Sequence, residues 1–246
     1  MEQLSVLGVA PEQIMSKSAL PRPSEPGPSL VAGAYQALKS AILETVFPPG
    51  YHASEQEIAL RLNMSRTPVH EALIRLQEEG LVAILPKRGI LVCALSPDDM
   101  REVYDIIISL EGTAAEIIAA KDAAARRAVA AELESFNEKM EAALADDDLA
   151  AWAKADDGFH RTLIGSCGNA RLARLANTIM DQSHRARMMT LRLRAKPVAS
   201  IKDHKAIIAA IRTGKPDAAL AKARDHRRRA GGELLPLLQK LGMTHL

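Results

Sequence analysis

The residue types best suited to chemistry in this chain are one carboxylate and three histidines in its second half. Asp156 and His160 are four positions apart in a segment of helical periodicity, so both side chains lie on one helix face. His204 and His226 fall in two later predicted helices. If these helices form a bundle, the four groups suit a divalent ion such as zinc or nickel, and manganese or iron is also tolerated. Asp157 would point about 100° away around the helix, so Asp156 is the predicted ligand.

Other interpretations of these residues compete with a metal site. A lone histidine beside apolar residues is more often a hydrogen-bonded core or surface group, and an Asp–His pair at this spacing can be a local hydrogen bond. A three-histidine site with open positions could also activate water. The sequence contains no HExxH motif, Ser/His/Asp grouping or glycine-rich phosphate loop, so we predict no catalytic residues and no enzyme.

A second group of residues suits contact with DNA. Ser65 begins a predicted helix with Arg66 and Thr67 in its first turn and His70 one turn later. Arginine can bond guanine O6 and N7 together, while hydroxyls and free N–H groups at a helix start suit phosphates. Taken alone, an ordinary capped helix start is the better interpretation of this segment.

The elements around this helix predict a winged helix-turn-helix. Periodic helical segments cover residues 30–46 and the stretches beginning at Ser54 and Ser65. Two β-rich runs then flank a turn that carries Lys87, Arg88 and Gly89, which predicts a small hairpin wing with a basic tip. In such a fold, the second helix of the pair enters the major groove.

The rest of the chain predicts an all-α bundle of six or seven helices, which makes the fold class mostly α. We expect a flexible N-terminal arm over residues 1–29, a winged-helix DNA-binding domain over 30–95 and a helical domain over 96–246. The predicted bundle helices cover residues 97–121, 123–146, 149–166, 170–194, 198–213 and 216–240.

Composition excludes some classes of protein. The 246 residues contain no apolar run of the roughly 18 residues needed to span a membrane, which excludes an integral membrane protein. The N-terminus lacks a secretory pattern, and the two cysteines form neither a disulfide framework nor a thiolate zinc cluster. We therefore expect a cytoplasmic protein in a reducing compartment.

The net charge of +2 conceals an uneven distribution. Residues 30–95 carry six acidic and six basic side chains, residues 98–157 carry sixteen acidic and six basic, and residues 181–229 carry four acidic and fourteen basic. Acidic and basic helices that pair at their rims are the simpler explanation. Alternatively, the two segments enclose a site for a cation, an anion or both.

The winged-helix residues resemble the GntR family of bacterial regulators. The resemblance covers residues 31–95 and rests on SRTPVHEAL at 65–73, QEEGLV at 77–82 and PKRG at 86–89. It implies a DNA-binding regulator, with no membrane partner. The family usually has arginine where His70 stands and often a basic residue where Gln56 stands; both positions usually help to contact the operator. Fewer fixed charges imply a shallower salt dependence of DNA binding.

The helical half, residues 97–240, resembles the FadR-type ligand domain of this family, called FCD. Its metal-binding members carry an Asp-x-x-x-His pair followed by two histidines on later helices. The resemblance therefore implies a metal site made of Asp156, His160, His204 and His226, with zinc as the first choice.

The resemblance also bears on the effector. Many members have an arginine four residues before a glutamate on the first helix of this domain, whereas here Ile107 precedes Glu111. This implies a larger or partly apolar effector, and the closest branch is that of the vanillate repressors. We expect Ser183 and Arg187 to contact the effector; alternatively, Arg187 pairs with the acidic helices.

The expected function is a homodimeric repressor that binds a palindromic operator. Its operator binding would respond to a small, anionic or aromatic-acid-related catabolic metabolite held beside the metal. The alternatives are a metal-responsive regulator without an organic effector and a metal-dependent hydrolase.

Overall fold

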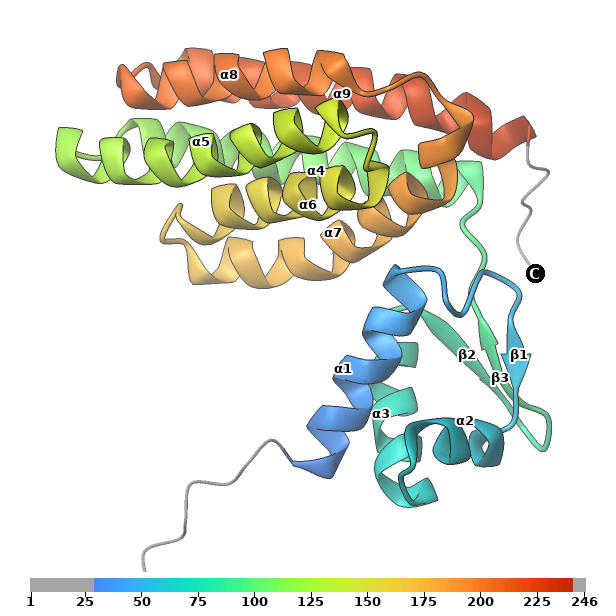
Figure 1. Ribbon diagram of the computed structural model, residues 1–246. Coiled ribbons are helices and arrows are strands. Elements are labelled where there is room, and N and C mark those ends of the chain that lie inside the picture. Colours follow the sequence, from blue (N-terminus) through green and yellow to red (C-terminus); the bar gives the residue numbers. More distant parts are fainter. Residues whose placement is uncertain (1–28, 241–246) are drawn as a thin grey trace, which may run out of the picture.

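The computed structural model describes residues 29–240, so the predicted N-terminal arm lies outside the described residues except for Ser29. Two hydrophobic clusters divide the fold, one spanning Ala34 to Val92 and the other Leu95 to Leu238. Figure 1 shows the first part as three helices and a small sheet below a bundle of long helices. The mostly α fold with a winged helix-turn-helix and a helical bundle is therefore confirmed.

The winged-helix part contains a three-stranded antiparallel sheet in the order β1-β3-β2. The predicted hairpin is present, with Ile84 opposite Ile90. Strand β1 was not predicted, because a strand of two residues shows no periodicity. The elements are α1 (Leu30–Leu43), β1 (His52–Ala53), α2 (Glu55–Leu62), α3 (Arg66–Glu78), β2 (Val82–Leu85) and β3 (Gly89–Val92).

Local sequence signals explain where these helices begin. Ser54 and Glu57 form the capping box at the start of α2: the Ser54 hydroxyl accepts from the Glu57 N–H, and the Glu57 carboxylate accepts from the Ser54 N–H. Ser65 precedes α3, but its side chain makes no capping bond to the described residues. The Ser65 hydroxyl and the first N–H groups of α3 therefore remain available for a ligand.

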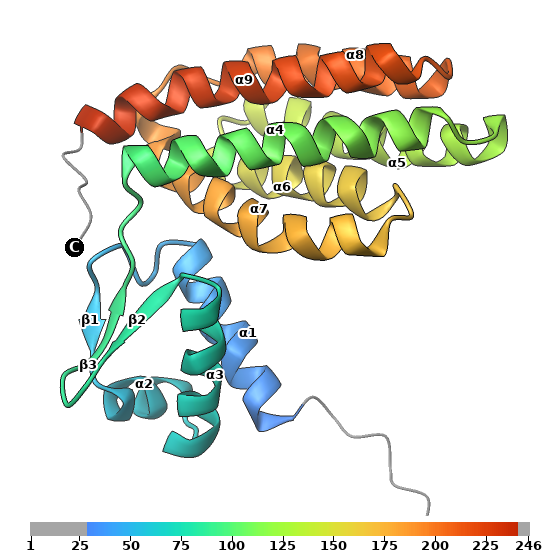
Figure 2. The same cartoon turned by 180° about the vertical axis from the view of Figure 1, so that it is seen from behind.

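Six long helices make up the described part of the bundle. Figure 2 shows α4 and α9 side by side, and α5 packs along α6. Helix α7 ends four residues earlier than predicted and continues as a short 3-10 turn. The elements are α4 (Pro97–Ala119), α5 (Ala123–Ala145), α6 (Leu149–Gly165), α7 (Ala170–Thr190), η2 (Leu191–Leu193), α8 (Val198–Arg212) and α9 (Pro216–Lys240).

The two parts touch where α1 lies against α7. Two polar contacts span this boundary: Lys39 pairs with Asp181, and Arg185 donates to the main-chain carbonyl of Cys93 at 2.7 Å. Among the described helices, none combines the length and apolar character needed to span a bilayer.

Candidate functional site

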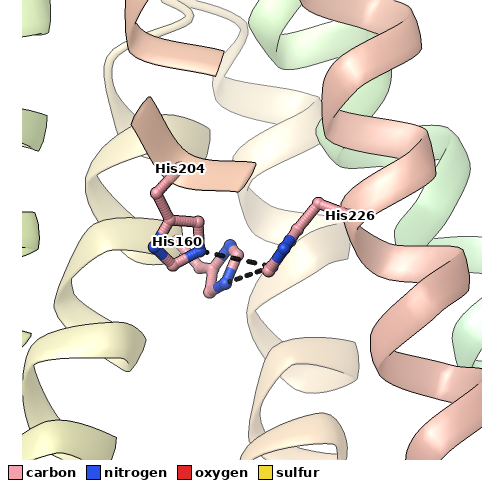
Figure 3. A group of neighbouring side chains, drawn as sticks. All are labelled: His160, His204 and His226. Atoms are coloured by element: carbon pink, nitrogen blue, oxygen red, sulfur yellow. Dashed lines mark hydrogen bonds between the residues drawn. The ribbon is translucent and has the colours of Figure 1, made fainter. Parts of the chain in front are cut away.

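Three histidine side chains converge inside the bundle from α6, α8 and α9 (Figure 3). The Nε2 atom of His226 lies 3.2 Å from that of His204 and 3.4 Å from that of His160. All three side chains are buried, with exposed fractions of 0–3%. The rings also stack, since Phe159 lies 3.9 Å from the His204 ring centroid. Packing therefore fixes the imidazoles before any ligand binds.

Asp156 completes the predicted set of four. It lies one helical turn before His160, and its Oδ2 is 3.7 Å from His160 Nε2 while Oδ1 is 3.8 Å from His204 Nε2. Arg187 donates to the same Oδ2 through Nε at 2.9 Å. Burial alone would raise the pKa of Asp156, but Arg187 and the neighbouring imidazoles lower the pKa overall, so the carboxylate is ionised.

Two carboxylates lie behind the imidazoles, and one of them, Asp203, is hydrogen-bonded to its histidine. Glu111 Oε1 lies 3.1 Å from Nδ1 of His160, and Asp203 Oδ2 lies 3.3 Å from Nδ1 of His226. The hydrogen bond with His226, and after it the one with Arg229, lowers the pKa of Asp203 to about 2. A neutral histidine whose Nδ1–H faces a carboxylate has its lone pair on Nε2, toward the centre of the cluster.

Burial lowers the pKa of His160 and His204 well below the usual value, and the electrostatic influence of neighbouring basic groups lowers both pKa values further. For His160 the first of these groups is Arg227, and for His204 it is His226. Both imidazoles are therefore neutral near pH 7, which is the form that binds a metal ion. The Nδ1 atoms of His160 and His204 have no hydrogen-bond partner among the described residues, so the His204 ring is held by stacking on Phe159 and by contact with the other imidazoles.

The spacing of the Nε2 atoms fits a metal ion. Two nitrogens bonded to one ion at about 2.1 Å lie about 3.0 Å apart at a right angle and about 3.4 Å apart at the tetrahedral angle. The observed 3.2 and 3.4 Å fall in this interval. With Nδ1–H directed at Asp203, the His226 imidazole presents the lone pair of Nε2 to the centre of the cluster, the atom that a metal ion would bind. The residues present therefore suit a divalent ion.

A small cavity of about 10 Å³ adjoins the imidazoles, enough for about one water molecule. Its lining is rich in cations and hydrogen-bond donors. Trp152 Nε1 and Arg194 Nε are buried without a hydrogen-bond partner among the described residues. The polar lining comprises Trp152, Asp156, His160, Arg187, Arg194, Ser200, His226 and Arg227, with Tyr104, Ala230 and Leu234 beside them.

The two residues predicted to contact the effector lie in different places: Arg187 lines the cavity and Ser183 does not. Arg187 pairs with the acidic helix α6 through Asp156, as the alternative interpretation expected, and it also lines the cavity, so contact with an effector stays a prediction. Ser183 is buried outside the cavity lining, and its hydroxyl accepts from Arg227 Nη1 at 3.4 Å. Ile107 lies fully in the hydrophobic core.

Sequence reasoning missed the buried pair between Glu111 and Arg227. Arg227 Nε donates to Glu111 Oε2 at 2.7 Å, and both side chains are at most 2% exposed. Arg194 was also missed. Neither arginine belongs to a short motif, and their neighbours in the chain give no periodic signal of burial beside a site. Only the position of Arg227 directly after His226 points to it.

The predicted DNA-contact residues lie on the surface of the winged-helix part. Gln56, Ser65, Thr67, Lys87 and Arg88 are exposed. Figure 1 shows α2 and the β2–β3 turn at the end of the molecule away from the bundle.

Arg66 and His70 share one acidic neighbour on this surface. Glu55 Oε1 lies 2.8 Å from His70 Nδ1, and Glu55 Oε2 lies 3.7 Å from Arg66. Gly89 has a structural reason for its identity, since it adopts φ +96° and a Cβ there would lie 2.2 Å from the Ala53 carbonyl oxygen. The glycine therefore lets β1 approach the hairpin.

Comparison with known proteins agrees with this arrangement. Residues 30–92 match the GntR family of bacterial regulatory proteins, and residues 102–229 match the FCD domain. A helix-turn-helix transcriptional regulator of Agrobacterium vitis, from the TAR-I ttuE–ttuC′ intergenic region, is 56% identical over 134 residues, which cover 54% of this chain and 78% of that protein.

Two Escherichia coli proteins extend the comparison. The helix-turn-helix transcriptional repressor RspR of strain K12 is 34% identical over 136 residues, covering 52% of this chain and 55% of RspR. The structure of McbR/YncC superposes with a TM-score of 0.73 at 18% identity, covering 87% of this chain and 98% of that protein. At this identity the second similarity shows the shared fold.

Proposed function

Because the chain belongs to the GntR family of bacterial regulatory proteins and carries an FCD domain, we propose that this transcriptional regulator is a repressor controlled through a metal-containing ligand site. The observation that carries the proposal is the convergence of three buried imidazole Nε2 atoms and one carboxylate beside a cavity lined with arginines. The relatives are transcriptional regulators and not enzymes, so the site has a binding role.

Arg66 is the proposed reader of the operator bases. It is the most exposed cation at the start of α3, with 69% of its side chain accessible, and a bidentate contact to guanine discriminates by about 1–3 kcal/mol. Ser65 and Thr67 bond DNA phosphates, and Lys87 and Arg88 contact the adjacent DNA backbone. The protein acts in the cytoplasm. A homodimer places two α3 helices in successive major grooves of a palindromic operator.

The metal ligands in this proposal are His160, His204, His226 and Asp156. Zinc is the first choice because it accepts imidazole and carboxylate ligands together; nickel, manganese and iron also tolerate such a set. When bound, the ion would supply positive charge that attracts an anion. Asp203 would keep the His226 imidazole oriented toward the ion, and Glu111 lies behind His160.

The effector that suits this site is a small carboxylate. Arg187, Arg194 and Trp152 provide donors around the cavity, and one carboxylate could bridge these donors and the metal. The cavity volume of about 10 Å³ is far below the roughly 300 Å³ of a drug-sized pocket. The cavity would therefore have to expand more to hold an aromatic acid than to hold a short hydroxy-acid. Ser183 contributes through Arg227, because it lies behind the cavity lining.

Two variants test the two sites separately. A DNA duplex selected from a random library by the wild-type protein should lose affinity about tenfold or more for Arg66→Ala, with Lys205→Ala on the exposed face of α8 as the matched control. Unchanged binding by Arg66→Ala would refute the base-reading role. His204→Ala should lower the zinc content of the purified protein, whereas His52→Ala, an exposed histidine on β1, should not.

The small volume of the cavity also favours a second candidate, a metal-responsive regulator without an organic effector. Affinity for the selected duplex should be measured with chelator, with zinc, and with zinc plus a panel of short hydroxy-acids and aromatic acids. Release of DNA by zinc alone, unchanged by every acid, would support the metal-responsive regulator over the effector-responsive one.

A further inference from the structure

Lys39 on α1 joins the winged helix to the bundle. Its Nζ lies 2.6 Å from Asp181 Oδ2 on α7, 2.8 Å from Glu79 Oε2 and 2.8 Å from the Tyr35 hydroxyl. The Asp181 side chain is only 2% exposed, so this carboxylate is buried between the two parts. One ammonium group therefore touches three partners on both sides of the boundary.

The partners on the winged-helix side are tied to α3, the helix that begins with Arg66. Glu79 is the residue that caps the C-terminal end of α3, and it also accepts from the Tyr35 hydroxyl. The guanidinium of Arg75, in the last turn of α3, lies 4.0 Å from the Tyr35 ring centroid. Lys39 thus holds the far end of the proposed reading helix.

The partner on the bundle side continues into a line of charged groups. Asp181 Oδ1 lies 2.7 Å from Arg161 Nη2, and Arg161 Nε donates to Asp157 Oδ2 at 2.6 Å. Asp157 is the neighbour of Asp156 in α6. Because consecutive helical residues point about 100° apart, one faces the domain boundary while the other faces the imidazoles.

The same line reaches the cavity by a second route. Asp157 Oδ1 lies 3.6 Å from His184 Nδ1, and Arg187 Nη1 lies 3.3 Å from that nitrogen. Arg187 then pairs with Asp156 at 2.9 Å. A cation bound by Asp156, or an anion bound by Arg187, would compete with the ion pair between these two residues.

Open grooves flank the Lys39–Asp181 pair. Grooves of about 590 and 380 Å³ lie along α1 on the bundle side, and one of about 410 Å³ lies between the sheet and α4. The direct contact between α1 and α7 is therefore narrow. An extensive packed interface would resist sliding, whereas here a rearrangement of the ion pairs would let α1 change its angle to α7.

We propose that Lys39 is a positioning residue that sets the angle of α3 against the bundle, and that Arg161 and Asp157 make this angle depend on the state of the metal centre. The inference rests on the proposed function, since it assumes a loaded site and a DNA-reading helix. It requires that the metal-loaded protein favours one interdomain arrangement, because only differential binding can shift such an equilibrium.

The experiment compares Lys39→Met with Lys39→Arg and with Lys154→Met, an exposed lysine of α6 that controls for the lost charge. Each full-length variant is titrated with the selected duplex in zinc and in chelator, and zinc affinity is measured separately by competition with a chromophoric chelator. We expect the two DNA affinities of the wild type to differ by about fivefold or more, as is usual for coupled sites.

Lys39→Met should bring that ratio close to one while zinc affinity stays within about twofold of wild type, and Lys39→Arg and Lys154→Met should retain the ratio. In chelator, Lys39→Met should also speed amide hydrogen exchange in α1 and α7, a readout that needs no metal. The inference is overturned if Lys39→Met keeps the wild-type ratio of the two DNA affinities. It is also overturned if the zinc-loaded wild type binds the duplex with the same affinity as the wild type in chelator. Absent zinc uptake or DNA selection instead refutes the proposed function itself.

Discussion

Replacing Arg227 by methionine tests whether the buried charges around the imidazoles are balanced as a set. The guanidinium contacts both carboxylate oxygens of Glu111 and reaches Ser183. After Arg227→Met, the Glu111 carboxylate would stay buried and keep only the nearby His160 Nδ1, which lies 3.1 Å away. The variant therefore leaves a negative charge in the core without its main partner.

The expected magnitude follows from the burial of both partners. Breaking a buried pair by removing one side costs about 3–5 kcal/mol, because the remaining charge is desolvated without compensation. Glu111→Leu combined with Arg227→Met removes both charges, and such replacements are often close to neutral. The double variant should therefore be more stable than Arg227→Met alone, which is the reverse of additive behaviour.

Urea unfolding in the presence of chelator measures these differences without a metal contribution. The single tryptophan, Trp152, is 1% exposed and reports on the bundle directly. Arg228→Met is the matched control, because Arg228 is 61% exposed, pairs with Asp225 at the surface, and should change stability by less than about 1 kcal/mol. A cost below about 1 kcal/mol for Arg227→Met, or additive costs in the double variant, would refute the reasoning.

Three other outcomes are expected. Burial, and after it the charge of Arg187, lowers the pKa of His184 to about 4, so below about pH 6.5 the unfolded chain binds a proton that the folded protein does not. Between pH 7 and 5, the free energy of unfolding should therefore fall by about 2 kcal/mol more in the wild type than in His184→Gln, as measured by urea unfolding at each pH. Gly158→Ala, whose Cβ would lie 2.3 Å from the Phe136 ring, should cost about 1–3 kcal/mol, whereas Gly165→Ala, which meets open space, should be neutral or slightly stabilising; equal unfolding midpoints would contradict this. Zinc at about 100 times its Kd should stabilise the bundle by about 2.7 kcal/mol in thermal unfolding, and excess chelator should reverse the gain.

Local features of the fold were predictable because they depend on neighbours in the chain. The Ser54–Glu57 capping box sets the start of α2, and Ser96 caps α4 by accepting from the N–H of Asp99. The prediction of helix to residue 194 was wrong, because residues 191–193 form a 3-10 turn instead. Nothing in the helical periodicity of that segment marks the change, since a turn of three residues is too short to distinguish a period of 3.0 from one of 3.6.

The site was predictable only in part. The spacing of Asp156 and His160 puts them on one helix face, but the contribution of α8 and α9 came from resemblance to a family, not from periodicity. The Glu111–Arg227 pair joins residues 116 positions apart, and the Lys39–Asp181 pair joins two parts of the fold. Such contacts depend on how helices pack, and a single sequence carries no local signal for that register.

The uneven charge of the sequence corresponds to two different kinds of contact in the bundle. Acidic and basic helices do pair at their exposed rims, where ion pairs contribute little to stability. They also meet inside, where burial makes each charge depend on its partner and where a bound ion would change the balance. The exposed pairs include Glu134–Arg212 and Glu141–Lys205, and the buried pairs include Glu111–Arg227 and Asp156–Arg187. The acidic half therefore supplies the carboxylate beside the imidazoles, and the basic half supplies the arginines around the cavity. In the proposed function, a metal ion would bind the first and an anionic effector the second.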